Sequence, residues 1–185
     1  AWYCIRKCNI GLANLDLMTD CTQEEKNFIK GQLLFFRAWW HEELIAFFGG
    51  MPYVDTVLDG ASVLTLPRLS YQECALKCAD DFRAAADLLP NDWDKTTIGK
   101  KTLGKNDFRI TKVCALGYLG KVLLWAASPL NNLGKAEKGA SKNGDTYKYN
   151  VDLAAKAADA LAEAISEVNS GKTPYALAEF DYENI

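Results

Sequence analysis

The chain has 185 residues, of which 49% are hydrophobic and 24% are charged, and its formal net charge is −3. This balance is typical of a globular domain and excludes an intrinsically disordered chain. Lysine and arginine are scattered among the acidic residues, so no basic stripe offers the phosphate-neutralising surface that nucleic-acid binding requires. No run of about 20 uncharged apolar residues occurs, which excludes a membrane-spanning helix.

Two helices are predicted in the N-terminal part of the chain. The first covers residues 1–17, where apolar residues recur at helical spacing and form one stripe. Asp20 and Thr22, followed by acidic residues, are the N-cap signals for the second helix. This helix continues to Phe48, and Gly49 and Gly50 then end it. Aromatic residues surround most of the second helix, so we expect it to be buried on more than one side.

Three further helices follow, separated by extended or polar segments. The first of them begins at a Ser-x-x-Glu capping box formed by Ser70 and Glu73. The next contains Gly117 and Gly120, which lower helix propensity, so we expect both to permit the close approach of a neighbouring backbone. The three predicted helices cover residues 70–89, 110–127 and 150–170.

The spacing of the helices predicts the architecture. Helix, turn and helix alternate, and successive starts lie about 40 residues apart, which resembles tetratricopeptide-type hairpins stretched by loop insertions. The connections over residues 51–67 and 131–149 are long for such hairpins. We therefore predict an all-α fold of tetratricopeptide-like helical hairpin repeats with long loops.

Two pairs of the six cysteines have helical spacing: Cys4 with Cys8, and Cys74 with Cys78. Residues four apart in a helix share one face. We favour small apolar core residues, because free cysteine is often fully buried. A four-thiolate metal site and disulfide bonds are the alternatives. Structural zinc usually has more closely spaced ligands, and a pair four apart in a helix does not easily meet the geometry of a disulfide.

The sequence offers little for catalysis. His41 is the only histidine, and nothing in the sequence nominates a partner for it, so we predict a structural, hydrogen-bonded histidine. The acidic pairs Glu42–Glu43 and Asp80–Asp81 are adjacent in sequence, and a helix points adjacent side chains in different directions, so we predict solvated face residues and no glycosidase pair. No glycine-rich phosphate loop occurs. We therefore predict a protein that is not an enzyme and needs no cofactor or metal.

Four blocks of sequence, in order, resemble the SusD/RagB family. Phe-Arg-Ala-Trp-Trp at 36–40 and Phe-Gly-Gly-Met-Pro at 48–52 are similar to the family's aromatic-Arg-Ala-aromatic-aromatic helix and its Phe-Gly-Gly-Val-Pro exit. Ala-Ala-Ala-Asp-Leu-Leu-Pro at 84–90 resembles the helix that closes in Ala-x-x-Leu-Pro. The segment 110–130, ending in Trp-Ala-Ala-Ser-Pro-Leu, and the helix that follows Tyr149 are also similar to family segments.

The resemblance implies a bacterial outer-membrane lipoprotein that faces outward and sits over a SusC-like, TonB-dependent transporter. Its ligands would be oligosaccharides, or in some members peptides and other nutrients, held without covalent chemistry and passed to the transporter. Family members are usually much longer. Residues 1–185 would then be part of a single SusD-like helical domain, truncated at both ends, with the lipidated cysteine upstream of this chain.

Two loops offer the residue types that bind sugars, which are an aromatic ring for the C–H face and Asn, Asp or Arg for the hydroxyls. Trp93 lies among polar residues after the third helix, and Asn131 and Asn132 follow the Ser-Pro-Leu corner after the fourth. For Trp93 the alternative is a ring that plugs the end of a helical hairpin. For the two asparagines it is ordinary helix-exit chemistry. The resemblance implies that much of the ligand surface lies outside the helical repeats.

Two other functions stay open. A helical-repeat scaffold could bind a protein or peptide in a groove and recognise no sugar. It would show a concave face with ordered polar side chains. A helical enzyme would require a hidden acid–base or metal site, such as zinc bound by the cysteine pairs.

Overall fold

The computed structural model describes residues 1–61, 65–131 and 148–176, and in these ranges it contains helices and no strand. The prediction of an all-α fold is therefore confirmed. The five α-helices are α1 (Trp2–Ala13), α2 (Gln23–Phe48), α3 (Tyr71–Leu88), α4 (Lys112–Ala127) and α5 (Val151–Asn169).

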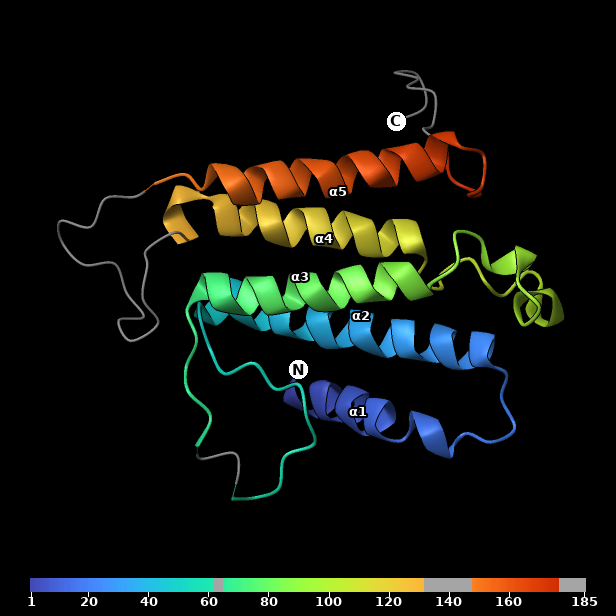
Figure 1. Ribbon diagram of the computed structural model, residues 1–185, viewed down its shortest axis with the longest axis horizontal. Helices are drawn as coiled ribbons and strands as arrows, with labels where there is room; N and C mark the ends of the chain where they lie inside the picture. Colours follow the sequence, from blue (N-terminus) through green and yellow to red (C-terminus); the bar gives the residue numbers. More distant parts are fainter. Residues whose placement is uncertain (62–64, 132–147, 177–185) are drawn as a thin grey trace, which may run out of the picture.

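The helices lie side by side in chain order and alternate in direction (Figure 1). Each packs against the next, so that α1 and α2, α3 and α4, and their neighbours form antiparallel hairpins. Helices α2 and α4 run parallel to each other and also touch, behind α3. This arrangement matches the predicted tetratricopeptide-like hairpins.

Side-chain caps fix where the central helices begin. Thr22 and Glu25 form a capping box at α2, and Ser70 and Glu73 form another at α3. The first helix is shorter than predicted: α1 ends at Ala13, and a 3-10 turn takes up the rest of the expected segment. That turn keeps the local hydrogen bonding but leaves the helical register, which a stripe of apolar residues cannot distinguish.

Two glycines explain the sharp exit of α2. Gly49 has φ of 70°, a left-handed conformation that favours glycine. At Gly50 an added Cβ would lie 2.0 Å from the carbonyl oxygen of Leu69, so only glycine lets the returning chain pass this closely. The chain therefore turns back beside the start of α3 immediately after α2.

Helix α2 contacts α1, α3 and α4, which confirms the predicted burial on more than one side. Its core residues are Phe28, Leu34, Phe35, Ala38 and Ile45. Not all of its aromatic residues are covered, however, because Phe36, Phe47 and Phe48 remain exposed.

The two glycines of α4 differ. An added Cβ at Gly120 would meet the Leu161 side chain at 2.5 Å, so this glycine does permit the close packing of α5. At Gly117 an added Cβ would meet no described atom within 4 Å. A neighbour does approach Gly120 closely, but it is a side chain and not the predicted backbone, and within the described structure no neighbour explains Gly117.

Candidate functional site

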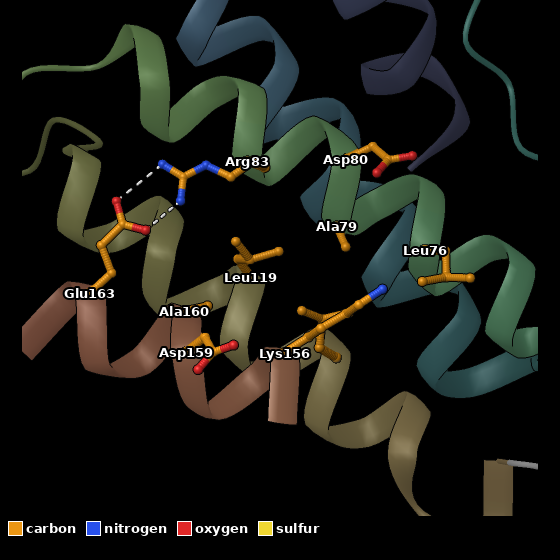
Figure 2. A pocket seen from close by; sticks show the side chains of 10 residues that line it. Leu76, Ala79, Asp80, Arg83, Leu119, Lys156, Asp159, Ala160 and Glu163 are labelled. Carbon is orange, nitrogen blue, oxygen red and sulfur yellow. Dashed lines mark hydrogen bonds and ion pairs between the residues drawn. The ribbon is translucent and has the colours of Figure 1, made fainter. Parts of the chain in front are cut away.

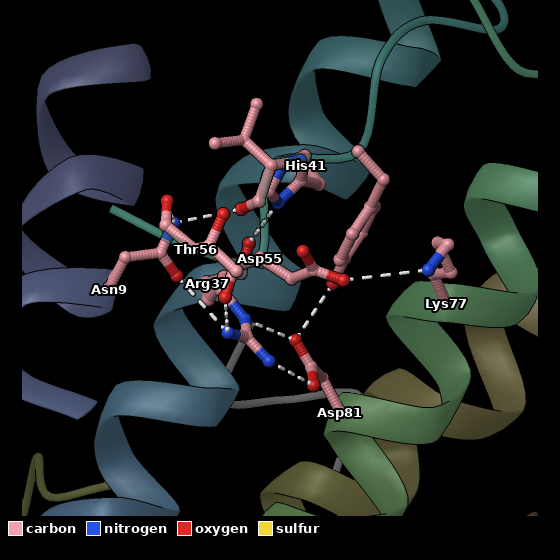
Figure 3. A network of polar contacts seen from close by, with 9 residues as sticks. Asn9, Arg37, His41, Asp55, Thr56, Lys77 and Asp81 are labelled. Carbon is pink, nitrogen blue, oxygen red and sulfur yellow. Dashed lines mark hydrogen bonds and ion pairs between the residues drawn. The ribbon is translucent and has the colours of Figure 1, made fainter. Parts of the chain in front are cut away.

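A buried polar network lies between α1, α2, α3 and the extended segment that follows α2, and it is centred on Arg37 of α2 (Figure 3). The Arg37 guanidinium donates to both carboxylate oxygens of Asp81 on α3, through Nε at 2.6 Å and Nη2 at 2.7 Å. Tyr53 donates its hydroxyl to the same carboxylate at 2.8 Å. Two-point pairing of this kind is geometrically specific and stronger than neutral hydrogen bonds. It joins α2, α3 and the segment after α2 inside the core. The prediction of solvated acids is therefore wrong for Asp81, which the pairing buries, and for Glu42, which is only 5% exposed.

The other side of the network reaches α1. Arg37 Nη1 donates to Asn9 Oδ1 at 3.1 Å and to the carbonyl of Asp55 at 2.9 Å. The Asn9 amide in turn donates to the carbonyls of Val54 and Thr56. The extended segment after α2 has no helix or sheet partner for these carbonyls, so the two side chains satisfy them and hold the segment in place.

His41 is a structural residue, as predicted. It is fully buried, and its Nε2 accepts a hydrogen bond from the Val54 N–H at 3.0 Å. Nδ1 therefore carries the proton and faces the Arg37 carbonyl at 2.8 Å. Burial, with the neighbouring Arg37 cation, lowers the pKa of His41 to about 4. Both ring nitrogens form hydrogen bonds with backbone groups, so the imidazole is not free to transfer protons.

Of the two cysteine pairs, Cys8, Cys74 and Cys78 are core residues as predicted, whereas Cys4 is only half-buried. All six are free thiols, and Cys8, Cys74 and Cys78 are buried. Burial raises the pKa of Cys8 to about 11, and the pKa of Cys74 and of Cys78 is also raised by burial. Thiols in this state are poor nucleophiles and poor metal ligands. In the described ranges no group of three or more His, Cys, Asp or Glu residues is placed to hold a metal ion.

Trp93 lies in a 3-10 turn, Trp93–Lys95, between α3 and α4, and only 3% of it is exposed. Its indole N–H donates to the Ile110 carbonyl at 2.9 Å. Phe28 packs edge-on against the ring, and the Arg109 guanidinium lies 4.7 Å from the ring centroid. This geometry favours the alternative of a ring that plugs the end of a hairpin, because no open ring face is left for a sugar. A ligand role for Trp93 stays a prediction.

Asn131 ends a 3-10 turn, Pro129–Asn131, directly after α4. Its amide donates to the Trp125 carbonyl at 3.0 Å and so caps a carbonyl in the last turn of the helix. This is helix-exit chemistry for the amide nitrogen, and it leaves the role of the side-chain oxygen open. Asn132 lies outside the described residues. The ligand role of both asparagines stays a prediction.

Sequence reasoning missed a groove between α3, α4 and α5 (Figure 2). Its volume is about 310 Å³, at the small end of the range for ligand pockets. The apolar part of the lining consists of Leu76, Ala79, Leu119, Leu123 and Ala160. The residues come from three helices, so no local pattern in the sequence could have grouped them.

Charged side chains line the rest of the groove. Arg83 forms two ion pairs: its Nη1 lies 2.6 Å from Oε2 of Glu163, and its Nη2 lies 2.6 Å from Oδ1 of Asp87. Asp80, Lys156 and Asp159 form no ion pair within the described part of the chain, and Lys156 extends from α5 toward α3 (Figure 2). The groove thus combines an apolar floor with free charges of both signs and has no aromatic ring in its lining.

None of the described helices is long and apolar enough to cross a bilayer.

Comparison with solved structures identifies relatives of the fold. A SusD-like protein from Bacteroides fragilis is 20% identical with a TM-score of 0.64, over 95% of this chain and 26% of its own. A SusD-like carbohydrate-binding protein from the same species is 23% identical with a TM-score of 0.56, over 86% of this chain and 25% of its own. Surface glycan-binding protein A from Bacteroides uniformis is 24% identical with a TM-score of 0.54, over 65% of this chain and 25% of its own.

The chain therefore spans about a quarter of the length of these structures. A search of curated proteins found no match. The sequence profile of the SusD-like family, described as starch-binding and associating with the outer membrane, matches residues 1–124. This match covers α1, α2, α3 and most of α4, including every residue of the network around Arg37. Because more than half of the sequence fits the profile, the chain belongs to the SusD-like family.

Proposed function

We propose that the chain is the helical part of a protein that binds oligosaccharides at the outer surface of the outer membrane. The bound glycan would be delivered to a SusC-like TonB-dependent transporter, and a lipid anchor upstream of this chain would hold the protein at the membrane. The family match over residues 1–124 carries the proposal. Relatives of the fold named as carbohydrate-binding and glycan-binding proteins support it.

Within that protein, residues 1–185 would form part of a single helical domain whose remaining segments lie outside this chain. The share of each structural relative that the chain covers, about a quarter, supports this division. Helix packing and the network around Arg37 suit a rigid scaffold, because the polar groups that join α1, α2 and α3 are satisfied inside the core.

The proposed mechanism is non-covalent capture, without a cofactor or a catalytic group. His41 supports this view because its two ring nitrogens are engaged by backbone groups. The buried thiols support it as well, since their raised pKa values keep them protonated at neutral pH. Affinity would come from hydrogen bonds to hydroxyls and from packing against the C–H faces of the sugar.

Calorimetric titration of the full-length protein against a panel of oligosaccharides and polysaccharides tests the proposal. We expect saturable binding of at least one glycan. If the corner after α4 contributes to the site, Asn131→Ala should weaken that binding by about 3–10-fold, the value of one hydrogen bond. Asn132→Ala and Trp93→Phe extend the test to the other two predicted residues.

Asn14→Ala is a matched control, because the Asn14 amide also donates to a carbonyl in the last turn of its helix. It should leave glycan affinity unchanged. If Asn14→Ala and Asn131→Ala changed glycan affinity equally, Asn131 would act only as a helix cap and not as a ligand-binding residue. If the full-length protein bound no glycan of the panel, the proposal of glycan capture would be wrong.

The groove between α3, α4 and α5 favours a second candidate, a scaffold that binds a peptide. Its apolar floor and the free charges of Asp80, Lys156 and Asp159 suit a peptide side chain with polar neighbours, whereas a sugar would find no aromatic ring there. Competition in the same titration separates the two functions. Peptide binding that persists in saturating glycan would favour this second function.

A further inference from the structure

The connection between α3 and α4 projects beyond the end of the bundle at which α3 finishes and α4 begins (Figure 1). We call residues 95–109 of this connection the tip. The tip carries five cationic residues and one acidic residue, a net charge of +4 in a chain whose total is −3. These charged residues are Lys95, Lys100, Lys101, Lys105, Asp107 and Arg109. The tip is therefore a local exception to the even spread of charge along the sequence.

Two consecutive turns place apolar residues at outer corners of the tip. In the first turn the Lys105 N–H donates to the Thr102 carbonyl at 3.0 Å, and Leu103 and Gly104 form the corner. Gly104 has φ of 75°, the left-handed conformation that a type II turn requires at its third position. Leu103, at the second position, is 62% exposed. The turn therefore presents a large apolar side chain to solvent.

The second turn follows directly and presents another apolar residue. The Arg109 N–H donates to the Asn106 carbonyl at 3.0 Å, and Phe108 lies at the corner with 99% of its surface exposed. The Thr102 hydroxyl donates to Asn106 Oδ1 at 2.8 Å, which ties together the first residues of the two turns. The two apolar corners are therefore neighbours. Turns favour Gly, Asn, Asp and Ser for their backbone chemistry, so folding gives no reason for phenylalanine at this corner.

Three of the cations beside these corners are unpaired. Lys100, Lys101 and Lys105 are exposed and form no ion pair within the described ranges. Lys101 does lie near the start of α2, where it adds to the lowering of the pKa of Glu25 by hydrogen bonds with Thr22. An unpaired lysine is almost never buried in a protein interior. We therefore expect the tip to stay on the surface when the rest of the polypeptide is present.

We propose that the tip docks on an anionic lipid surface, where Leu103 and Phe108 enter the interface and the lysines contact the phosphate groups. Charge complementarity argues for this partner, because lysines around exposed apolar side chains are the combination that anionic lipid surfaces attract. The matched family profile, which includes the tip, is described as associating with the outer membrane. The contact rests on the proposed location of the protein at that membrane and is independent of glycan binding.

The polar groups of the tip favour a lipid surface over an acidic glycan. The Asn106 amide donates to the Asp94 carboxylate at 2.6 Å and to the Gly99 carbonyl at 3.0 Å, and Asn106 itself is only 6% exposed. The side chain best suited to recognise sugar hydroxyls is thus used inside the tip. Apolar corners and long ammonium side chains remain, and these suit a fluid charged interface better than a ligand of fixed stereochemistry.

Cosedimentation of the full-length polypeptide with lipid vesicles tests the proposal. The protein is produced without acylation, so that no lipid anchor contributes to binding. The vesicles contain either phosphatidylcholine alone or an equal mixture of phosphatidylcholine and phosphatidylglycerol. We expect binding to the anionic mixture, weaker by about 10-fold or more on phosphatidylcholine alone and reduced by added salt.

Charge and apolar variants locate the contact. Lys100→Gln combined with Lys105→Gln should weaken binding by about 25-fold, or about fivefold for each charge removed. Lys7→Gln combined with Lys77→Gln is the matched control, because both lysines are exposed and lie on α1 and α3. This control should bind as the wild type does.

Phe108→Ser should weaken binding by about 10-fold through the loss of its apolar surface. Phe47→Ser is the matched control, because Phe47 is 80% exposed and lies near the far end of α2. The exposure of Phe108 means that its replacement should leave Tm unchanged, and circular dichroism checks this.

Absence of binding to the anionic vesicles would overturn the proposal, and so would equal losses in the tip variants and their controls. Binding of the acidic polysaccharide polygalacturonate that the tip variants weaken, without vesicle binding, would overturn it in favour of an acidic glycan. The vesicles contain no sugar, so a negative result here is distinct from a failure of the oligosaccharide titration.

Discussion

Replacing Arg37 with methionine is expected to lower the free energy of unfolding by about 3–5 kcal/mol. The variant would leave the Asp81 carboxylate buried with only the Tyr53 hydroxyl as a hydrogen-bond donor. It would also remove the donor that Arg37 supplies to the Asp55 carbonyl. A buried charge without its partner is costly because the interior solvates it poorly. Urea unfolding at pH 7, followed by circular dichroism, measures the loss.

Arg83→Met is the matched control. Arg83 of α3 is also an ion-paired arginine, with distances of 2.6 Å to the carboxylates of Glu163 and Asp87. Its side chain, however, is 35% exposed, compared with 11% for Arg37. Exposed pairs contribute about 0–1 kcal/mol, so this variant should lose little stability. The double variant Arg37→Met with Asp81→Asn should recover part of the loss, because it removes the orphaned charge. Equal losses for Arg37→Met and Arg83→Met would contradict the role assigned to the buried network.

The features that sequence predicted well are local ones. The N-cap signal before α2 and the capping box at Ser70 depend on residues a few positions apart, and the exit of α2 depends on adjacent glycines. Such signals act through short-range hydrogen bonds and steric limits that do not need the rest of the fold. This is why the starts of α2 and α3 lie where they were predicted, whereas the end of α1, which has no such signal, was placed too late.

The features that sequence could not predict depend on distant contacts. Arg37 and Asp81 are 44 residues apart, and nothing near either residue indicates that they pair. Trp93 shows the same limit. The sequence left open whether the ring is accessible or plugs the end of a hairpin, and contacts with the distant residues Phe28 and Ile110 bury it. The groove arises because separate helices lie side by side, and each helix alone shows only an ordinary mixture of apolar and charged residues.

The stability of the protein is expected to fall by about 3 kcal/mol between pH 6.5 and pH 4 through His41 alone. In the folded state burial lowers the pKa of His41 to about 4, whereas in the unfolded chain it takes its ordinary value near 6.5. Above pH 6.5 the imidazole is neutral in both states and contributes no pH dependence. Below that value the unfolded chain binds a proton that the folded protein refuses, so unfolding becomes more favourable until the pH reaches about 4.

His41→Gln isolates this contribution from that of the carboxylates. At pH 7 the variant should be less stable than the wild type, because glutamine cannot serve both the Val54 N–H and the Arg37 carbonyl in the geometry of the imidazole. Its further loss on acidification should be smaller by about 2–3 kcal/mol, since no group at position 41 titrates. Glu25, Glu73 and Glu167, whose pKa values are lowered by hydrogen bonds, lose their contributions equally in both proteins. The difference between the two urea-unfolding series, measured from pH 7 to pH 4, therefore gives the contribution of His41 to the pH dependence of the free energy of unfolding. Parallel series would mean that His41 is accessible to protons in the folded protein and that its contact with Val54 is not maintained in solution.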